Sequence, residues 1–422
     1  MKTISTPEFE KVVLQGGKVA VDFYSTECAP CEAVAPKFDS CAEIYGEDIT
    51  FVKIFRQENR ELATSLGVKS SPTILFFENG KQVGKMLTGG IKRSDLMANL
   101  DAMLSPERVS ELKTNIKKTE THFDTVILGG GPAGLAAAIY LGQAKVKTAL
   151  IDQSMPGGQI SITHKVSNYP GFIEPVQGFM LSHYMSEQAR ATGVEFKSAV
   201  DVSSVNLKEK YIVVDGIETV HFDYLIVATG SSPRLMNIPG ELQYKGQGIS
   251  YCATCDAKYF QDKEVIIIGG GNSAIEESDF ISKFASKITI ITHGEALRAN
   301  KDAQKQLLEN PKVSVIYNSD PKEFIKNGEQ MTVVIENKQT KLQESVTADG
   351  IFIFVGMQPN VSMFNDAFET DQWGYIKVSD EMETSIPGVY SVGDINSKKF
   401  RQITTAVADG TIAGIAVSRK IQ

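Results

Sequence analysis

The sequence is poor in several features that would mark other classes of protein. Its 422 residues include one tryptophan, five histidines and five cysteines. No stretch approaches the roughly 18 consecutive apolar residues of a membrane helix. Acidic residues outnumber basic ones, 51 to 43, so no overall positive field is available for nucleic acid or an anionic membrane. Residues 1–11 contain no apolar run, so we expect no secretory signal and a cytoplasmic protein.

Four of the five cysteines form two Cys-x-x-Cys pairs, Cys28/Cys31 and Cys252/Cys255. In a chain without a signal, such pairs favour redox or metal chemistry over a structural disulfide framework. A zinc site that pools both pairs is the alternative. The first pair follows a predicted buried strand at residues 19–24 and opens a predicted helix, whose N-terminus favours a thiolate at Cys28. Cys41 is left over, and we expect it to be a small buried residue.

Two strand–glycine-turn–helix patterns predict two dinucleotide-binding units. The first follows a strand at residues 125–128 and consists of Gly129, Gly131, Pro132, Ala133 and Gly134. Its glycines allow a tight turn, close approach of a pyrophosphate, and close helix–strand packing. Asp152 follows Gly131 at the spacing of an acid that binds a ribose hydroxyl. The second pattern follows residues 265–268 and consists of Gly269, Gly271, Asn272, Ser273 and Ala274.

Residues 1–105 resemble thioredoxin. Asp22 lies where thioredoxins keep a buried acid that relays a proton to the resolving cysteine, and Pro72 matches the cis-proline that faces the disulfide. The resemblance makes Cys28 the attacking cysteine and Cys31 the resolving one. Glu27 and Tyr24 stand where that family usually has tryptophans, and the charge of Glu27 puts broad partner specificity in question.

Residues from about 122 to 422 resemble low-molecular-weight thioredoxin reductases. The resemblance implies FAD as the ligand of the first glycine motif. It also implies that Cys255 faces the flavin, that Cys252 attacks the outgoing disulfide, and that Asp256 moves the proton. The further residues expected to line or support the FAD site are Gly158, Gln159, Asn168, Ala228, Thr229, Gly230, Gly393, Asp394, Arg401 and Gln402.

The expected fold class is α/β, a thioredoxin fold followed by two Rossmann-like three-layer domains, with the FAD domain discontinuous in sequence. We expect a thioredoxin-like domain at 1–105 and a linker, or a lightly packed helix, at 106–120. The expected FAD-binding domain comprises 121–235 and 357–422, and the nucleotide-binding domain comprises 236–356 with the second cysteine pair.

The electron donor is less well defined. Reductases that use NADPH carry two adjacent arginines after the second strand of the nucleotide domain, and this sequence has His293 and Gly294 there. Those two residues cannot grip a 2′-phosphate as arginines do. Only Arg298 matches a phosphate-binding arginine. NADH, NADPH and a donor such as ferredoxin all remain. The intact glycine turn ranks a nicotinamide nucleotide first, with NADH slightly ahead of NADPH.

The expected function is a fused thioredoxin reductase and thioredoxin. Electrons would pass from NAD(P)H through FAD and Cys252–Cys255 to Cys28–Cys31 and then to a protein disulfide, in a homodimer without a metal. One alternative is a reductase that feeds a peroxiredoxin, as alkyl hydroperoxide reductase flavoproteins do. Another makes residues 1–105 a docking module that carries no electrons.

Overall fold

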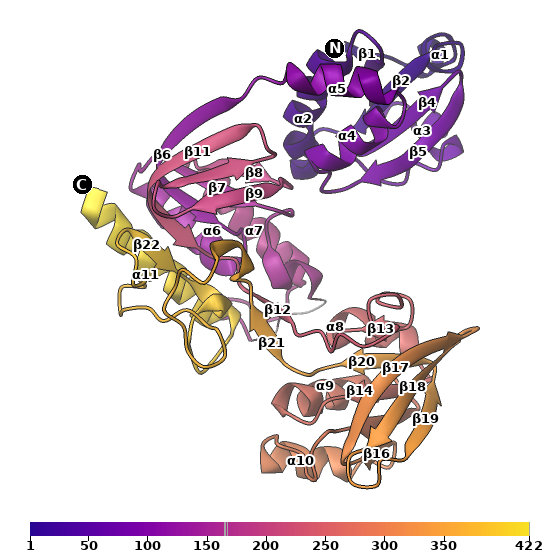
Figure 1. Cartoon of the computed structure of the whole chain (residues 1–422), viewed down its shortest axis with the longest axis vertical. Helices are drawn as coiled ribbons and strands as arrows, with labels where there is room; N and C mark the ends of the chain where they lie inside the picture. Colours follow the sequence, from indigo (N-terminus) through magenta and orange to yellow (C-terminus); the bar gives the residue numbers. More distant parts are fainter. Residues whose placement is uncertain (164–165, 167, 422) are drawn as a thin grey trace.

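The computed structural model of the chain describes residues 1–163, 166 and 168–421, apart from the side chains of Thr254 and Cys255. These residues form three α/β units, and the end of the chain returns to the middle unit (Figure 1). Among the described residues, no helix has both the length and the apolar character needed to cross a membrane.

The first unit is a five-stranded sheet, in the order β1-β3-β2-β4-β5, between two layers of helices. Both faces of its central strand are covered, so residues 19–23 are all buried. Ala20 packs in a cluster with α2 and α4, while Val21 and Phe23 pack with α1 and α3 on the other face. The elements are β1 (Lys2–Thr3), α1 (Thr6–Phe9), the π-helix η1 (Glu10–Leu14), β2 (Lys18–Tyr24), α2 (Ala29–Tyr45), β3 (Thr50–Phe55), α3 (Arg60–Ser65), β4 (Thr73–Glu78), β5 (Lys81–Thr88) and α4 (Arg93–Asp101).

Most of the segment expected as a linker or a lightly packed helix is a helix packed on the first unit. Helix α5 (Pro106–Thr114) begins at Ser105, whose side chain accepts a hydrogen bond from the Arg108 N–H. Leu112 is buried in the cluster that contains α2, and Arg108 pairs with Asp48. Because β6 begins at Thr119, only residues 115–118 remain between the packed elements.

The middle unit is a seven-stranded sheet assembled from two separate stretches of sequence. The order β8-β7-β6-β11-β10-β9 is completed by β22, which returns from the C-terminal stretch to pair in parallel with β11. Helix α11 lies against α6, where a Cβ at Gly410 would overlap the carbonyl oxygen of Ala133. The elements are β6 (Thr119–Leu128), α6 (Pro132–Gln143), β7 (Thr148–Asp152), the 3-10 helix η2 (Gly158–Ile162), α7 (Gly178–Arg190), β8 (Glu195–Ser198), β9 (Val202–Asn206), β10 (Tyr211–Val214), β11 (Glu218–Val227), the short 3-10 helix η4 (Ser362–Phe364), β22 (Val389–Ser391), the 3-10 helix η5 (Gly393–Ile395) and α11 (Ile403–Ile421).

The third unit combines a parallel sheet in the order β13-β20-β14-β15-β16 with an antiparallel sheet of β17, β18 and β19. Its central strands are continuous apolar runs because helices cover one face and the second sheet covers the other. The elements are β13 (Ile249–Ser250), α8 (Ala253–Asp256), the 3-10 helix η3 (Ala257–Phe260), β14 (Glu264–Ile268), α9 (Asn272–Ser282), β15 (Lys287–Ile291), α10 (Lys301–Leu308), β16 (Val313–Ile316), β17 (Ser319–Asn327), β18 (Gln330–Asn337), β19 (Gln343–Ala348) and β20 (Gly350–Ile353).

Two antiparallel strands, β12 (Ser231–Pro233) and β21 (Met357–Pro359), connect the middle and third units. They carry the chain out of the middle unit and back into it, and they lie beside the expected boundaries at 235/236 and 356/357. The fold class expected from the sequence, three α/β units with an interrupted second unit, is confirmed.

Candidate active site

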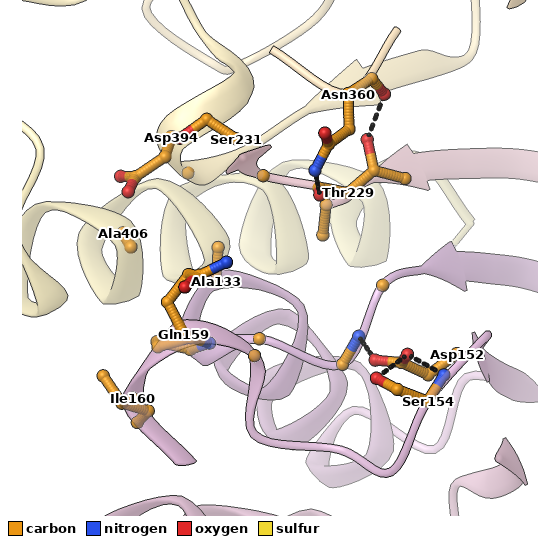
Figure 2. Close-up of a pocket in the computed structure, with 18 of the residues that line it drawn as sticks. Ala133, Asp152, Ser154, Gln159, Ile160, Thr229, Ser231, Asn360, Asp394 and Ala406 are labelled. Atoms are coloured by element: carbon orange, nitrogen blue, oxygen red, sulfur yellow. Dashed lines mark hydrogen bonds between the residues drawn. The ribbon is translucent and has the colours of Figure 1, made fainter. Parts of the chain in front are cut away.

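A cavity of about 870 Å³ lies at the carboxyl ends of the parallel strands of the middle unit (Figure 2). It contains most of the residues expected to bind FAD from both stretches of the sequence. The expected residues that line it are Gly129, Gly131, Pro132, Ala133, Asp152, Gly158, Gln159, Ala228, Thr229, Gly230, Gly393, Asp394, Arg401 and Gln402.

The glycine turn forms the floor of this cavity at the N-terminus of α6. Gly129 has a φ of 112°, which residues other than glycine rarely adopt. Gly134 does not line the cavity; a Cβ there would overlap the carbonyl oxygen of Gly129, so this glycine permits the helix to pack on the turn. The exposed N–H groups of a helix N-terminus favour a phosphate group in this position.

Asp152 is held at one end of the cavity by the chain around it. Its carboxylate accepts hydrogen bonds from the Gly130 N–H at 2.6 Å and the Ser154 N–H at 2.7 Å, drawn as dashed lines in Figure 2. Burial raises the pKa of this carboxyl, and the hydrogen bonds from Ser154 and Gly130 oppose the rise. The carboxylate is thereby fixed where the spacing predicts a ribose hydroxyl.

Asp394 enters the cavity from the C-terminal stretch. Its Oδ1 atom is buried and has no hydrogen-bond partner among the described residues, and burial raises the pKa of the carboxyl. A ligand hydroxyl would satisfy this atom, so the cavity fits a polyhydroxylated ligand such as FAD. Arg401 stabilises the turn that presents Asp394: its guanidinium donates to the carbonyls of Asp394 and Asn396 and stacks on Tyr375.

Several residues of this site were not identified from the sequence. Asn360 lines the cavity and exchanges two hydrogen bonds with Thr229, across 131 positions of sequence. Asn168, which was expected, does not line the cavity, but its side chain donates to the side chain of Gln402, which does, at 3.1 Å. The remaining unexpected lining residues include Gln153, Ser154, Met155, Ser161, Thr163, Ser231, Ser362 and Met363.

A second cavity, of about 1240 Å³, lies between the middle and third units and contains Cys252 and Asp256. Cys252 is disulfide-bonded; the side chain of Cys255 lies outside the described residues. Asp256 accepts a hydrogen bond from the Ser250 hydroxyl at 2.6 Å, and Ser250 Oγ accepts one from the Cys252 N–H at 3.1 Å. Ser250 thus orients the acid toward the start of the cysteine motif.

The two cavities share part of their lining. Gln159, Ser161, Ile162 and Thr163 line both of them, so η2 forms a common wall between the expected flavin site and Cys252.

The cysteine pair of the first unit forms a disulfide at the N-terminus of α2. Cys28 is the N-cap residue, and its sulfur accepts a hydrogen bond from the Cys31 N–H at 3.2 Å. The same sulfur lies 3.6 Å from the carbonyl oxygen of Ser71, which precedes the cis-proline Pro72. Cys41 is fully buried, as expected.

Asp22 is buried in β2 and has one carboxylate oxygen without a partner among the described residues. Burial raises the pKa of this carboxyl to about 7, and the charge of Lys53 opposes that rise. A pKa near neutral suits a group that exchanges protons with a thiol at physiological pH.

The second glycine motif lies at the turn between β14 and α9. Gly269 has a φ of 142°, Ala274 is buried beneath the turn, and Asn272 and Ser273 are exposed at the first turn of α9. The Arg298 N–H donates to the carbonyl of Gly270 at 2.7 Å. His293, just beyond β15, lies between Asp320 at 2.5 Å and Lys338 at 2.8 Å. The expected nucleotide residues therefore lie together at the carboxyl ends of the neighbouring strands β14 and β15.

Comparison with known proteins assigns the larger part of the chain. The model of the pyridine nucleotide-disulphide oxidoreductase family matches residues 123–410. The chain belongs to this family. A thioredoxin model matches residues 1–102. The oxidoreductase part and the thioredoxin part expected from the motifs are both confirmed, and the family implies FAD and a pyridine nucleotide as cofactors.

Relatives of this oxidoreductase cover its last two units. A thioredoxin reductase of Peptoclostridium litorale is 40% identical over 310 residues, 72% of this chain and 98% of the relative. The thioredoxin reductase of Bacillus subtilis (strain 168) is 37% identical over 304 residues, 72% of this chain and 96% of that protein. The crystal structure of Lactococcus lactis thioredoxin reductase (FR conformation) matches with a TM-score of 0.63 and 37% identity, covering 70% of this chain and 98% of that one.

The raised pKa of Asp22 predicts a pH-dependent stability of the thioredoxin unit. The folded state keeps the proton up to about pH 7, whereas the unfolded chain releases it near pH 4. The contribution of Asp22 to the free energy of unfolding is therefore most favourable below about pH 4, and it is lost as pH rises to about 7. Asp22→Asn should remove this loss and make the unit more stable than wild type at pH 8 by a few kcal/mol, at about 1.4 kcal/mol per pKa unit.

Urea titrations of the full chain at pH 4.5 and pH 8, followed by hydrogen exchange of β2 and β4, would measure the change. Glu61→Gln is the control, because Glu61 is an exposed acid on α3 and its replacement should change stability by less than about 1 kcal/mol at both pH values. An unchanged pH dependence in Asp22→Asn would contradict the assignment.

Proposed function

We propose that this chain is a thioredoxin reductase joined to its own thioredoxin, and that it passes electrons from a nicotinamide nucleotide to a protein disulfide. The observation that carries the proposal is the common wall of η2 between the two cavities. A flavin in the first cavity would be next to the Cys252 motif in the second. The relatives named thioredoxin reductases and the attached thioredoxin domain point to the same activity.

The roles of the residues follow from their positions. FAD, when bound, accepts a hydride and supplies an electron pair to one disulfide. Asp152 and Asp394 would hold its hydroxyls, and the Gly129–Gly134 turn its phosphates. Cys255 would accept the electron pair as the Cys252–Cys255 bond breaks, and Asp256, oriented by Ser250, would protonate the departing thiolate of the pair.

Transfer to the thioredoxin unit is a thiol–disulfide exchange. Asp256 takes the proton back from Cys252 as the Cys252 thiolate attacks Cys28 and displaces the Cys31 thiolate, which is protonated with the help of Asp22. Cys255 then attacks Cys252, restores that disulfide and releases Cys28 as a thiolate. The Cys28/Cys31 dithiol next reduces the disulfide of a protein substrate by the same exchange. We further propose a homodimer in the cytoplasm.

Cysteine variants test this relay. Cys28→Ser and Cys31→Ser should lower reduction of insulin by about a hundredfold or more, because the last carrier is lost, while the donor still bleaches the flavin. Cys252→Ser should abolish electron transfer to Cys28–Cys31. Cys41→Ala is the control, since Cys41 belongs to neither pair.

Unchanged turnover in Cys28→Ser/Cys31→Ser would instead make residues 1–105 a docking module. The same assays with a peroxiredoxin as acceptor would show whether that class of protein is preferred over insulin.

We infer that NADH is preferred to NADPH as the donor. His293 is held between Asp320 and Lys338, so the repulsion of a 2′-phosphate by the Asp320 carboxylate offsets its attraction to the Lys338 ammonium group. Gly294 offers no side chain, and the Arg298 side chain is exposed. This surface suits the two hydroxyls of an unphosphorylated ribose.

The ratio of kcat/KM for NADH and NADPH measures this preference. His293→Arg with Asp320→Asn should shift the ratio toward NADPH by about tenfold or more, because it adds one charged contact and removes a repulsive group. Asp320→Asn alone separates the two effects. Faster bleaching of the flavin by NADPH, or by reduced ferredoxin, in the wild-type protein would contradict the inference.

A further inference from the structure

The thioredoxin unit is attached to the middle unit by a buried lysine as well as by the chain. Lys37, in α2, is 8% exposed. Its ammonium group donates to three carbonyl oxygens: Ile91 of its own unit at 3.1 Å, and Ser198 and Ala199 of the middle unit at 2.8 and 2.6 Å. All three of its N–H donors thus have partners, two of them across the interface.

The surface that receives Lys37 has a backbone conformation suited to a cation. Ala199 has a φ of 52°, which is uncommon for a residue with a side chain. This conformation allows two consecutive carbonyls to converge on one ammonium group. Two backbone hydrogen bonds hold the turn. The Ala199 N–H donates to the carbonyl oxygen of Ser154, and the Val200 N–H donates to the carbonyl oxygen of Asp152.

Further contacts continue the interface around this lysine. Lys92 forms an ion pair with Asp201 at 2.9 Å. Met155 lies against Gly90, where a Cβ would be 3.1 Å from its Cγ atom. Burying the amine lowers the pKa of Lys37 to about 8, and the nearby charges of Asp215 and Asp201 oppose this change. The interface therefore compensates for the burial of a cation, which an incidental contact between two units would not need to do.

The position of this interface separates the two redox disulfides. Gly90 is next to Gly89, whose N–H donates to the carbonyl oxygen of Pro72. Because Pro72 follows Ser71, whose carbonyl oxygen lies near the Cys28 sulfur, the contact reaches the edge of the face that carries Cys28. On the other side, Met155 belongs to the Asp152 end of the FAD cavity, whereas Cys252 belongs to the cavity beyond η2. Figure 1 shows α2 and α8, which follows Cys252, well apart.

We propose that the surface formed by Met155, Ser198, Ala199 and Asp201 is a docking site for the chain's own thioredoxin unit. Lys37 is its anchor, and docking holds Cys28–Cys31 away from Cys252 between rounds of exchange. The unit leaves this site to receive electrons and returns afterwards. The holding role rests on the proposed electron relay; the docking itself does not.

Two variants test the docking from its two sides, in the full-length protein loaded with FAD. Lys37→Met keeps the unbranched chain and removes the ammonium group, and Asp201→Asn removes the partner of Lys92 without altering the thioredoxin unit. Both should raise hydrogen exchange at residues 89–94 and 199–201, Lys37→Met by about tenfold or more. Lys81→Met, at an exposed position on β5, is the control and should behave as wild type.

Rapid mixing with the donor then tests the holding role. Reduction of Cys28–Cys31 should be faster in both variants than in wild type, because a larger fraction of the thioredoxin units is free. Unchanged hydrogen exchange in both variants would overturn the docking site. Raised exchange with slower or unchanged reduction would overturn the holding role. A protein that reduced no disulfide would refute the relay but leave the exchange measurement valid.

Discussion

Electron transfer from a flavin to a disulfide requires the two groups to meet, and the short helix η2 is where this chain brings their sites together. Residues of η2 line the cavity of the glycine turn on one side and the cavity of Cys252 on the other. The helix is held to the rest of its unit through Ile160, which is buried in the core. The other parts of the account, the cofactor, the donor and the attached thioredoxin, depend on this contact.

Movement of the thioredoxin unit is limited by the chain that attaches it. The packing of α5 leaves residues 115–118, which span at most about 14 Å. If α5 detached and unfolded, residues 106–118 would reach about 45 Å. A short tether gives a high effective concentration of the attached unit, so a docking site can influence exchange even when its affinity is modest. The two-stranded connection β12–β21 is a separate junction, between the middle and third units.

The sequence predicted those parts of the site whose residues are neighbours in sequence. Glycine turns and cysteine pairs need particular residues at fixed short spacings, and the structure places the first glycine turn at a cavity and the Cys28–Cys31 disulfide at the start of α2. Asn360 and Met155 line the cavity because of tertiary contacts, which no local sequence pattern predicts. Lys37 is the extreme case, because two of its acceptors are backbone carbonyls 161 and 162 positions away, and carbonyls carry no sequence signal. The packing of the helix at 106–114 was not predicted, because the segment has a single buried apolar residue, Leu112. Its composition is therefore that of a polar linker.

The central claim is that one bound flavin shares electrons with two cysteine pairs in the same chain. An anaerobic titration of the oxidised, FAD-loaded protein with dithionite, with the thiols counted after acid quenching, measures this directly. We expect uptake of one electron pair for the flavin and one for each cysteine pair, with thiols appearing at Cys28 and Cys31 as well as at Cys252 and Cys255. Uptake that ends with Cys28–Cys31 still oxidised while the flavin and the other pair are reduced would contradict it.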